Sequence, residues 1–181
     1  MKTVLILHGI QGYPGIHWQQ WLYGELVKQG YQVLMPKFPN ANHPNRKSWL
    51  KTIKKTVKQI NLKNLIIVAH SLGVTSALDL LETLDTPIKA LVSVSGFSKD
   101  YGLELNSYFL KEKSINFKKI RQNCKNFFVY YGDNDPYVPQ KVLKDLADSL
   151  GVKPRIFPHG GHLNTEAGYT RFPELLKIIF H

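Results

Sequence analysis

One short segment, Val68-Ala69-His70-Ser71-Leu72-Gly73-Val74, places a serine where an expected strand ends and an expected helix begins. Residues 65–68 before it are apolar and mostly β-branched, which is typical of a strand buried on both faces. The residues after it fit one buried helix face, formed by Leu72, Ala77, Leu78, Leu81 and Leu84. The segment therefore predicts a tight strand-to-helix turn with Ser71 at its tip.

The residue types around Ser71 match those of a nucleophile elbow. Such a turn strains the backbone of its central residue and has room only for small residues on either side. The serine hydroxyl then lies above the sheet at a helix N-terminus, where the helix dipole favours developing negative charge. The first small position holds Ala69 instead of glycine, which weakens the match without breaking it.

The length and composition indicate one globular domain spanning residues 1–181. A chain of this size buries about 70% of its unfolded surface and needs no cross-links. Cys124 is the only cysteine, so no intramolecular disulfide can form, and we expect it to be a packing residue. The apolar run at residues 3–7 is too short for a secretory signal, and no segment could span a membrane. We therefore expect a cytoplasmic protein without membrane insertion.

The formal net charge of +11 raises the question of a nucleic-acid partner. Within residues 47–60, however, apolar side chains form one stripe and lysines occupy the other side, as in an amphipathic helix with a solvated face. No nucleic-acid-binding module is recognisable, and lysine outnumbers arginine, which argues against specific phosphate or base recognition. We expect no nucleic-acid partner and at most a mild preference for anionic substrates.

Apolar runs alternate with helical patterns along the whole chain. The expected strands are residues 3–8, 31–35, 64–69, 88–95, 126–132 and 154–157. The expected helices are residues 17–29, 47–60, 72–84, 139–150 and 171–180. This alternation predicts an α/β protein with a parallel sheet of about six strands and helices on both faces. In such sheets the functional crevice lies beyond the carboxyl ends of the strands.

The loop after the first strand is rich in glycine, which lets its backbone approach the space above Ser71. The amide of Ile10 or of Gln11 could donate a hydrogen bond into that space, and the Leu72 amide would supply the second donor for an oxyanion. Taken alone, the loop fits a flexible connection equally well, but its pairing with the elbow favours the oxyanion role. His8 would brace this loop, and His70 would pack against neighbouring strands.

The fifth strand runs into Gly132-Asp133-Asn134-Asp135-Pro136-Tyr137-Val138-Pro139. A carboxylate just beyond a strand end can accept the Nδ1 proton of a catalytic histidine and fix its tautomer. Asp135 and Asp133 compete for this role. We favour Asp135, which stands directly before a proline, because Asp133 follows a glycine and suits a turn-capping role better.

The sixth strand leads to a glycine-flanked histidine, His162, whose mobile backbone allows its ring to approach a serine. His159 is the fallback for this role. The remaining histidines His17, His43 and His181 have no such context, and we expect them at the surface or in packing. No grouping of histidine, cysteine and carboxylate has metal-ligand spacing, so neither a metal nor a cofactor is expected.

Nucleophile, acid and base thus appear in the order Ser71, Asp135, His162, which is the order of α/β-hydrolases. The chain resembles the small, lidless serine hydrolases of the retinoblastoma-binding-protein-nine and YdeN type. The likeness is carried by His8-Gly9 with Gly12, the segment 17–22, the elbow, the segment 134–139 and Gly161-His162. It implies an α/β-hydrolase fold with strand order 2-1-3-4-5-6, no separate cap domain, and esterase-like or peptidase-like activity.

In the expected chemistry His162 accepts the proton of Ser71 as the serine attacks the carbonyl of a small-molecule acyl substrate. Asp135 stabilises the resulting imidazolium, and the oxyanion is held by the amides of Ile10 and Leu72. Esterases, thioesterases and peptidases share this triad, so the sequence does not separate them.

Substrate contacts are expected mainly from residues 97–117, the place where larger relatives carry a lid. In this segment Leu103, Leu105 and Leu110 are also expected to line an apolar acyl pocket. The main pocket candidates are Gln11, Trp18, Tyr101, Tyr108, Phe109 and Tyr137. Trp18 and Trp21 stand three residues apart on one helix face, so core packing is the favoured role for both and pocket lining the second.

Two functions from other classes compete with hydrolysis. A non-catalytic protein-interaction module on a hydrolase scaffold is possible in principle, but such a module has no need for all three triad residues. A binder of nucleic acid or of an acidic surface is supported by charge alone, and its association would have to weaken with salt.

Overall fold

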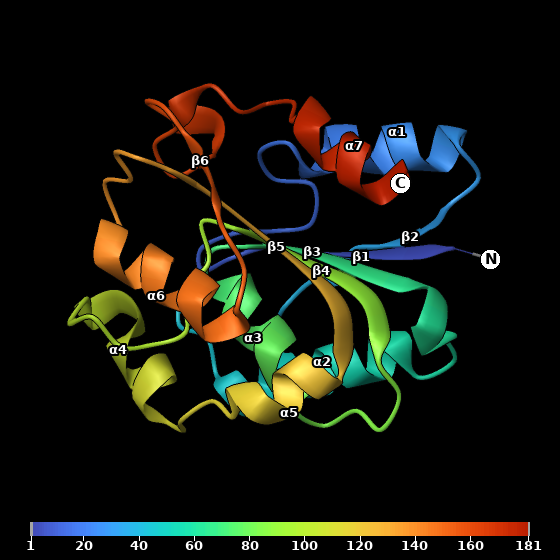
Figure 1. The fold of residues 1–181 in the computed structure, drawn as a ribbon, viewed down its shortest axis with the longest axis horizontal. Helices are drawn as coiled ribbons and strands as arrows, with labels where there is room; N and C mark the ends of the chain where they lie inside the picture. The colour runs from blue at the N-terminus through green and yellow to red at the C-terminus, as the bar shows by residue number, and fades with distance from the viewer. Residues whose placement is uncertain (1, 181) are drawn as a thin grey trace.

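A computed structural model describes residues 2–180 and has a six-stranded parallel sheet at its centre (Figure 1). The strands are β1 (Thr3–Leu7), β2 (Gln32–Leu34), β3 (Leu65–His70), β4 (Ile88–Val94), β5 (Cys124–Gly132) and β6 (Arg155–Phe157). Their order in the sheet is β2-β1-β3-β4-β5-β6, and every neighbouring pair is parallel. The predicted strand order and fold class are confirmed. Met1 and His181 lie outside the described residues.

Helices cover both faces of the sheet, as predicted (Figure 1). On one face lie α1 (Gln19–Lys28) and α7 (Pro173–Phe180). On the other face lie α2 (Arg46–Val57), α3 (Leu72–Leu81), α5 (Phe117–Gln122) and α6 (Gln140–Leu150). Each face has its own apolar core, because the central strands β1 and β3 are buried along their whole length and alternate side chains between the two sides.

The lysine-rich helix α2 is amphipathic in the way its sequence indicates. Trp49, Ile53 and Val57 are buried on its inner side. The lysines are exposed, namely Lys47, Lys51, Lys54, Lys55 and Lys58. Among residues 2–180 no helix combines the length and the apolar character needed to cross a membrane.

The main difference from the expected elements lies in residues 97–117 and just after them. This region was expected to contribute pocket residues without a helix, but it contains α4 (Glu104–Lys111) and leads into α5. Two single-turn helices, Leu62–Asn64 and Thr165–Ala167, also went unpredicted. The first helix begins at Gln19 rather than at residue 17, because the backbone of His17 adopts a positive φ of 59° and cannot start a right-handed helix.

A buried ion pair attaches α4 to the rest of the fold. Arg46 at the start of α2 and Asp79 on α3 are 3% and 1% exposed, and the guanidinium bonds the carboxylate at 2.7 and 2.9 Å. The same guanidinium donates to the main-chain carbonyl oxygens of Phe109, Leu110 and Lys113, at 3.1, 3.2 and 3.0 Å. One side chain thus joins two core helices to the C-terminal end of α4.

Candidate active site

The turn between β3 and α3 has the strained geometry of a nucleophile elbow. Ser71 adopts φ 54° and ψ −129°, a conformation that a side chain disfavours, and its amide donates to the Val94 carbonyl at 2.9 Å. A Cβ at Gly73 would lie 2.4 Å from the main-chain oxygen of His8, and one at Gly9 would lie 2.8 Å from the Cβ of Ser71. Glycine is therefore required where the first loop meets the elbow.

His162 and Asp135 form a short hydrogen bond at the carboxyl end of the sheet. The His162 Nδ1 lies 2.7 Å from Asp135 Oδ2, and the two side chains are 8% and 0% exposed. The other carboxylate oxygen accepts the amides of Tyr137 and Val138, at 2.9 and 3.1 Å. Because a carboxylate only accepts hydrogen bonds, Nδ1 carries the proton and the neutral ring keeps its lone pair on Nε2.

The two aspartates of the loop after β5 have separate tasks. Asp133 Oδ1 accepts the amide of His159 at 2.8 Å, and Asn134 Oδ1 accepts the amide of Gly161 at 2.7 Å. These bonds fasten the loop after β5 to the loop after β6, which carries His162. Of the two candidates, Asp135 is the carboxylate that contacts the histidine, and His159 is an exposed residue of the same loop.

His70, directly before Ser71, contacts the main chain of His162. Burial lowers the pKa of His70 well below its ordinary value, so its ring is neutral. Its Nε2 lies 2.9 Å from the His162 carbonyl oxygen and donates to it, and the two rings lie 4.9 Å apart. Packing alone was expected for His70. The bond was not predictable, because the partners are 92 residues apart in the sequence.

Two backbone amides near Ser71 are free to act as donors. The Leu72 amide is the first of helix α3, so it has no acceptor within the helix. The Gln11 amide donates to the carbonyl of Ala41 at 2.7 Å and is engaged there. Within the described chain the Ile10 amide makes no such bond, so it is the better of the two oxyanion donors considered for this loop.

His8 braces the loop that carries Ile10. Its Nε2 accepts the amide of Phe38 at 3.3 Å, which leaves the proton on Nδ1 to bond the Gly9 carbonyl at 2.8 Å. Burial lowers the pKa of His8 and so favours this neutral tautomer. The loop backbone is thus held in place next to the elbow.

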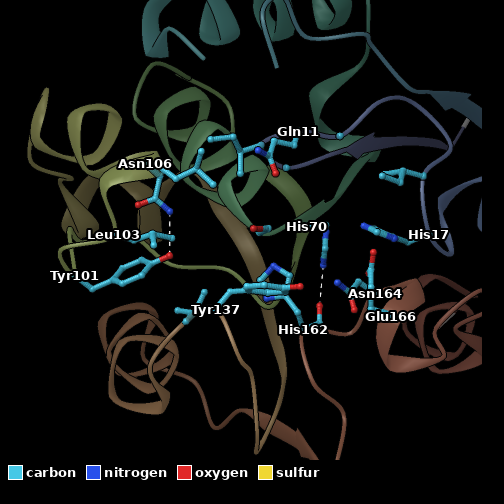
Figure 2. A pocket seen from close by; sticks show the side chains of 17 residues that line it. Gln11, His17, His70, Tyr101, Leu103, Asn106, Tyr137, His162, Asn164 and Glu166 are labelled. Atoms are coloured by element: carbon cyan, nitrogen blue, oxygen red, sulfur yellow. Dashed lines mark hydrogen bonds between the residues drawn. The ribbon is translucent and has the colours of Figure 1, made fainter. Parts of the chain in front are cut away.

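Ser71 and His162 share a cavity of about 290 Å³, and the side chains around it lie at two ends (Figure 2). Tyr101, Leu103 and Asn106, from α4 and the residues just before it, lie at one end, and Leu105 also lines the cavity. His17, Asn164 and Glu166 line the other end, and His70 and His162 lie between the two. Gln11 and Tyr137, two further predicted pocket residues, also line this cavity.

Trp18 does not line the cavity, so the pocket role proposed for it is wrong. Its side chain is fully buried in the core under α1, and its Nε1 donates to the carbonyl of Leu163 at 3.0 Å. The favoured core-packing role was therefore the correct one. Its neighbour Trp21 packs against the same core while remaining partly exposed.

Tyr108 and Phe109 are also wrong as pocket residues, and so is Leu110, because helix α4 turns them away from the cavity. Tyr108 is 39% exposed and stacks on the ring of His43 at 4.5 Å. Phe109 is buried in the core, with its ring 5.6 Å from that of Trp49. In α4 and the residues just before it, the side chains that line the cavity all lie between Tyr101 and Asn106.

The end of the cavity opposite α4 was not predicted. His17, expected at the surface or in packing, lines the cavity, and its Nδ1 accepts the amide of Thr165 at 3.2 Å. Burial lowers the pKa of His17, and the nearby Glu166 carboxylate opposes this shift. These residues lie in loops without a periodic pattern. The only available signal was that both loops lie at the carboxyl edge of the sheet.

Burial raises the pKa of Cys124 to about 12, so its thiol stays protonated and unreactive. This agrees with the packing role expected for it. In the part of the chain that the structure describes, no three residues of the His, Cys, Asp and Glu types are grouped so as to hold a metal ion.

Comparison with known proteins gives a consistent result. The family described as Serine hydrolase matches residues 4–181. A Bacillus subtilis protein named as hydrolase YdeN is 30% identical, over 98% of this chain and 94% of its own length. The serine hydrolase RBBP9 of Rattus norvegicus is 28% identical, over 98% of this chain and 93% of its own.

The crystal structure of the ydeN gene product from B. subtilis superposes with a TM-score of 0.90 and covers 99% of both chains. Its fold agrees with the sheet order found here. With its elbow, its strand order and its match to the family over nearly its whole length, this chain belongs to the serine hydrolase family of the α/β-hydrolase type.

Proposed function

We propose that this protein hydrolyses a small carboxylic ester, or a related acyl compound, through an acyl-enzyme intermediate on Ser71. The observation that carries the proposal is the 2.7 Å bond from His162 to the buried Asp135, with His162 lining the same cavity as the serine of the elbow. The proposed reaction uses no metal, no cofactor and no nucleic acid.

In the first half-reaction His162 Nε2 accepts the hydroxyl proton while Ser71 Oγ forms a bond to the carbonyl carbon. The amides of Ile10 and Leu72 donate to the oxyanion of the tetrahedral intermediate. The carbon–oxygen bond to the alcohol then breaks, and the imidazolium gives its proton to the departing alcohol.

In the second half-reaction water takes the place of the alcohol. His162 removes one proton from it, the water oxygen attacks the acyl carbon, and the bond to Ser71 Oγ breaks as the proton returns to the serine. Asp135 stabilises the imidazolium in both halves without taking its proton. The amides of Tyr137 and Val138, which donate to Asp135 Oδ1, hold the carboxylate in position for this role.

The size of the cavity supports a small substrate. A volume of about 290 Å³ lies at the lower end of the range for small-molecule pockets. We expect the highest activity with short acyl groups and a steady loss as the acyl chain lengthens.

The proposal is tested by labelling with a fluorophosphonate probe, followed by mass-spectrometric location of the adduct. We expect one adduct on Ser71 in the wild-type protein and none in Ser71→Ala. Ser149→Ala serves as the matched control, because this serine lies on α6 away from the cavity, and it should be labelled like the wild type. A folded wild-type protein without an adduct, or an adduct that persists in Ser71→Ala, would contradict the proposal.

A further inference from the structure

A hydrogen-bonded pair of side chains, Tyr101 and Asn106, lies at the α4 end of the cavity (Figure 2). The Asn106 Nδ2 donates to the Tyr101 hydroxyl oxygen at 3.0 Å. Asn106 is only 2% exposed and is part of helix α4, so the position of the tyrosine hydroxyl is fixed from behind by a rigid element.

The bond with Asn106 uses the tyrosine oxygen as an acceptor and leaves its proton available. A tyrosine hydroxyl can donate one hydrogen bond, and among residues 2–180 the Tyr101 proton has no acceptor. Burial raises the pKa of Tyr101, so the hydroxyl remains a donor throughout the neutral range. In Figure 2 the ring extends from the outer edge of this end toward the middle of the cavity.

The surroundings of this donor are largely apolar. Leu103 lies beside it in Figure 2, and Leu105 and Val138 line the same cavity. A substrate that places only hydrocarbon here leaves the hydroxyl proton without a partner, which costs binding free energy. A substrate with an oxygen at this point accepts a hydrogen bond from the hydroxyl. A fixed donor in an apolar wall therefore discriminates between substrates of the same shape.

The charges near the Tyr101 hydroxyl further restrict the kind of substrate group that can accept its hydrogen bond. The negative charges of Asp135 and Asp100 both act on the Tyr101 hydroxyl and contribute to the rise of its pKa. Negative charge on a substrate would be repelled by the same carboxylates. The matching group is therefore a neutral oxygen, as in an ether, a hydroxyl or a carbonyl, rather than a carboxylate.

We propose that Tyr101, held in place by Asn106, is a specificity-determining residue that donates a hydrogen bond to a neutral oxygen of the substrate, away from the reacting carbonyl. This inference rests on the proposed function, since it takes Ser71 as the nucleophile of the same cavity. The expected substrates are esters that carry an additional neutral oxygen, in preference to plain alkyl esters.

Two pairs of isosteric esters test the proposal, one for each half of the substrate. The acyl pair is 4-nitrophenyl 3-methoxypropanoate and 4-nitrophenyl pentanoate. The alcohol pair is 2-methoxyethyl acetate and butyl acetate. Each pair exchanges one CH₂ for an ether oxygen. The ratio of the two kcat/KM values is compared between wild type and variant, so that differences in intrinsic reactivity cancel.

We expect Tyr101→Phe to reduce the preference for the ether ester about fivefold in one of the two pairs, the range expected for one neutral hydrogen bond. Asn106→Leu should reduce it in the same pair, since the hydroxyl loses its orienting partner. The control is Tyr108→Phe, which makes the same change seven residues further along the chain, on α4 and outside the cavity, and it should leave both ratios unchanged.

Equal ratios in the wild type and in Tyr101→Phe for both pairs would overturn the proposal. Fluorophosphonate labelling of the same preparations separates this failure from a failure of the proposed function. If Ser71 is labelled and the ratios do not move, the subsite is refuted while the hydrolase mechanism stands. If Ser71 is not labelled, the proposed function is refuted and the subsite with it.

Discussion

The cavity has one wall formed by the elbow and the loop after β1, and another formed by Tyr101 and helix α4. Different interactions hold these two walls in place. The wall that carries Ser71 follows a buried strand and meets the first loop so closely that Gly9 and Gly73 leave no room for a Cβ. The wall formed by α4 has exposed leucines and is attached through the buried Arg46. The position of the reacting groups is thus determined by the sheet, whereas the proposed substrate contact through Tyr101 belongs to a segment outside the sheet.

The largest effect is expected from Asp135→Asn on the wall that carries the chemistry. An amide in place of the carboxylate favours the wrong histidine tautomer, and we expect kcat to fall about 10⁴-fold. Asp133→Asn is the control, because this side chain only accepts the His159 amide, and it should retain activity. Steady-state hydrolysis of a 4-nitrophenyl ester measures both. Comparable losses in the two variants would show that the loop as a whole matters rather than the bond to His162.

The next effect concerns the attachment of the α4 wall. Arg46→Leu leaves Asp79 buried with only Lys113 near it, at 3.1 Å, so we expect the free energy of unfolding to fall by about 3–5 kcal/mol. Urea denaturation measures this loss, with Arg121→Leu as the control at an arginine exposed to solvent. A folded Arg46→Leu protein should also show a raised KM with Ser71 still labelled. A loss no larger than that of the control would show that α4 is held by other contacts.

A smaller effect is expected at His70, which connects the elbow of Ser71 to the loop that carries His162. His70→Phe removes the bond to the His162 carbonyl, and a small misplacement of the catalytic ring should lower kcat about 10- to 100-fold with little change in KM. His70→Gln keeps a donor and should recover part of the loss. Equal activity of the two variants would assign His70 to packing alone.

The smallest effect is the pH dependence of stability. Because burial lowers the pKa of His70 from its ordinary 6.5, the unfolded chain binds more protons than the folded one below this pH. Stability is therefore complete above pH 6.5 and falls on acidification, by about 1.4 kcal/mol per pH unit for one fully neutral histidine. The buried His8 and the half-buried His17 act in the same direction.

Urea denaturation between pH 8 and pH 5 measures this slope. His70→Phe should show a shallower slope than the wild type, while His159→Gln, at an exposed side chain, should keep the wild-type slope. Parallel slopes in the wild type and His70→Phe would mean that His70 is not the group responsible.

The parallel sheet was predictable because the central strands are continuous apolar runs and the helices between them are periodic, whereas its strand order was implied by the family resemblance. Helices α4 and α5 escaped prediction because they have only 8 and 6 residues. In such short segments the local pattern is too brief to distinguish a helix from a loop. Tertiary contacts, such as those of Arg46 with the end of α4, decide the outcome.

The candidate site was predictable to the extent that parallel strands bring their carboxyl ends to one edge. Ser71, Asp135 and His162 each follow a strand, and the structure brings their loops together at that edge. The side-chain directions within loops were not predictable. His17 lines the cavity with a positive φ that no periodic pattern records, and Asn106 lines it from helix α4, which itself went unpredicted.

Arg46 has one further consequence, for the way new specificities can arise in this protein. On α4 its guanidinium donates to the main-chain oxygens of Phe109 and Leu110 and lies 5.7 Å from the centre of the Phe109 ring, so its contacts with the helix do not involve the side chains that face the cavity. Substitutions along the cavity-facing part of α4 can therefore accumulate while the helix stays docked. Libraries that randomise Leu103, Leu105 and Asn106 should yield mostly folded proteins, and new substrate preferences can be selected from them without redesigning the scaffold.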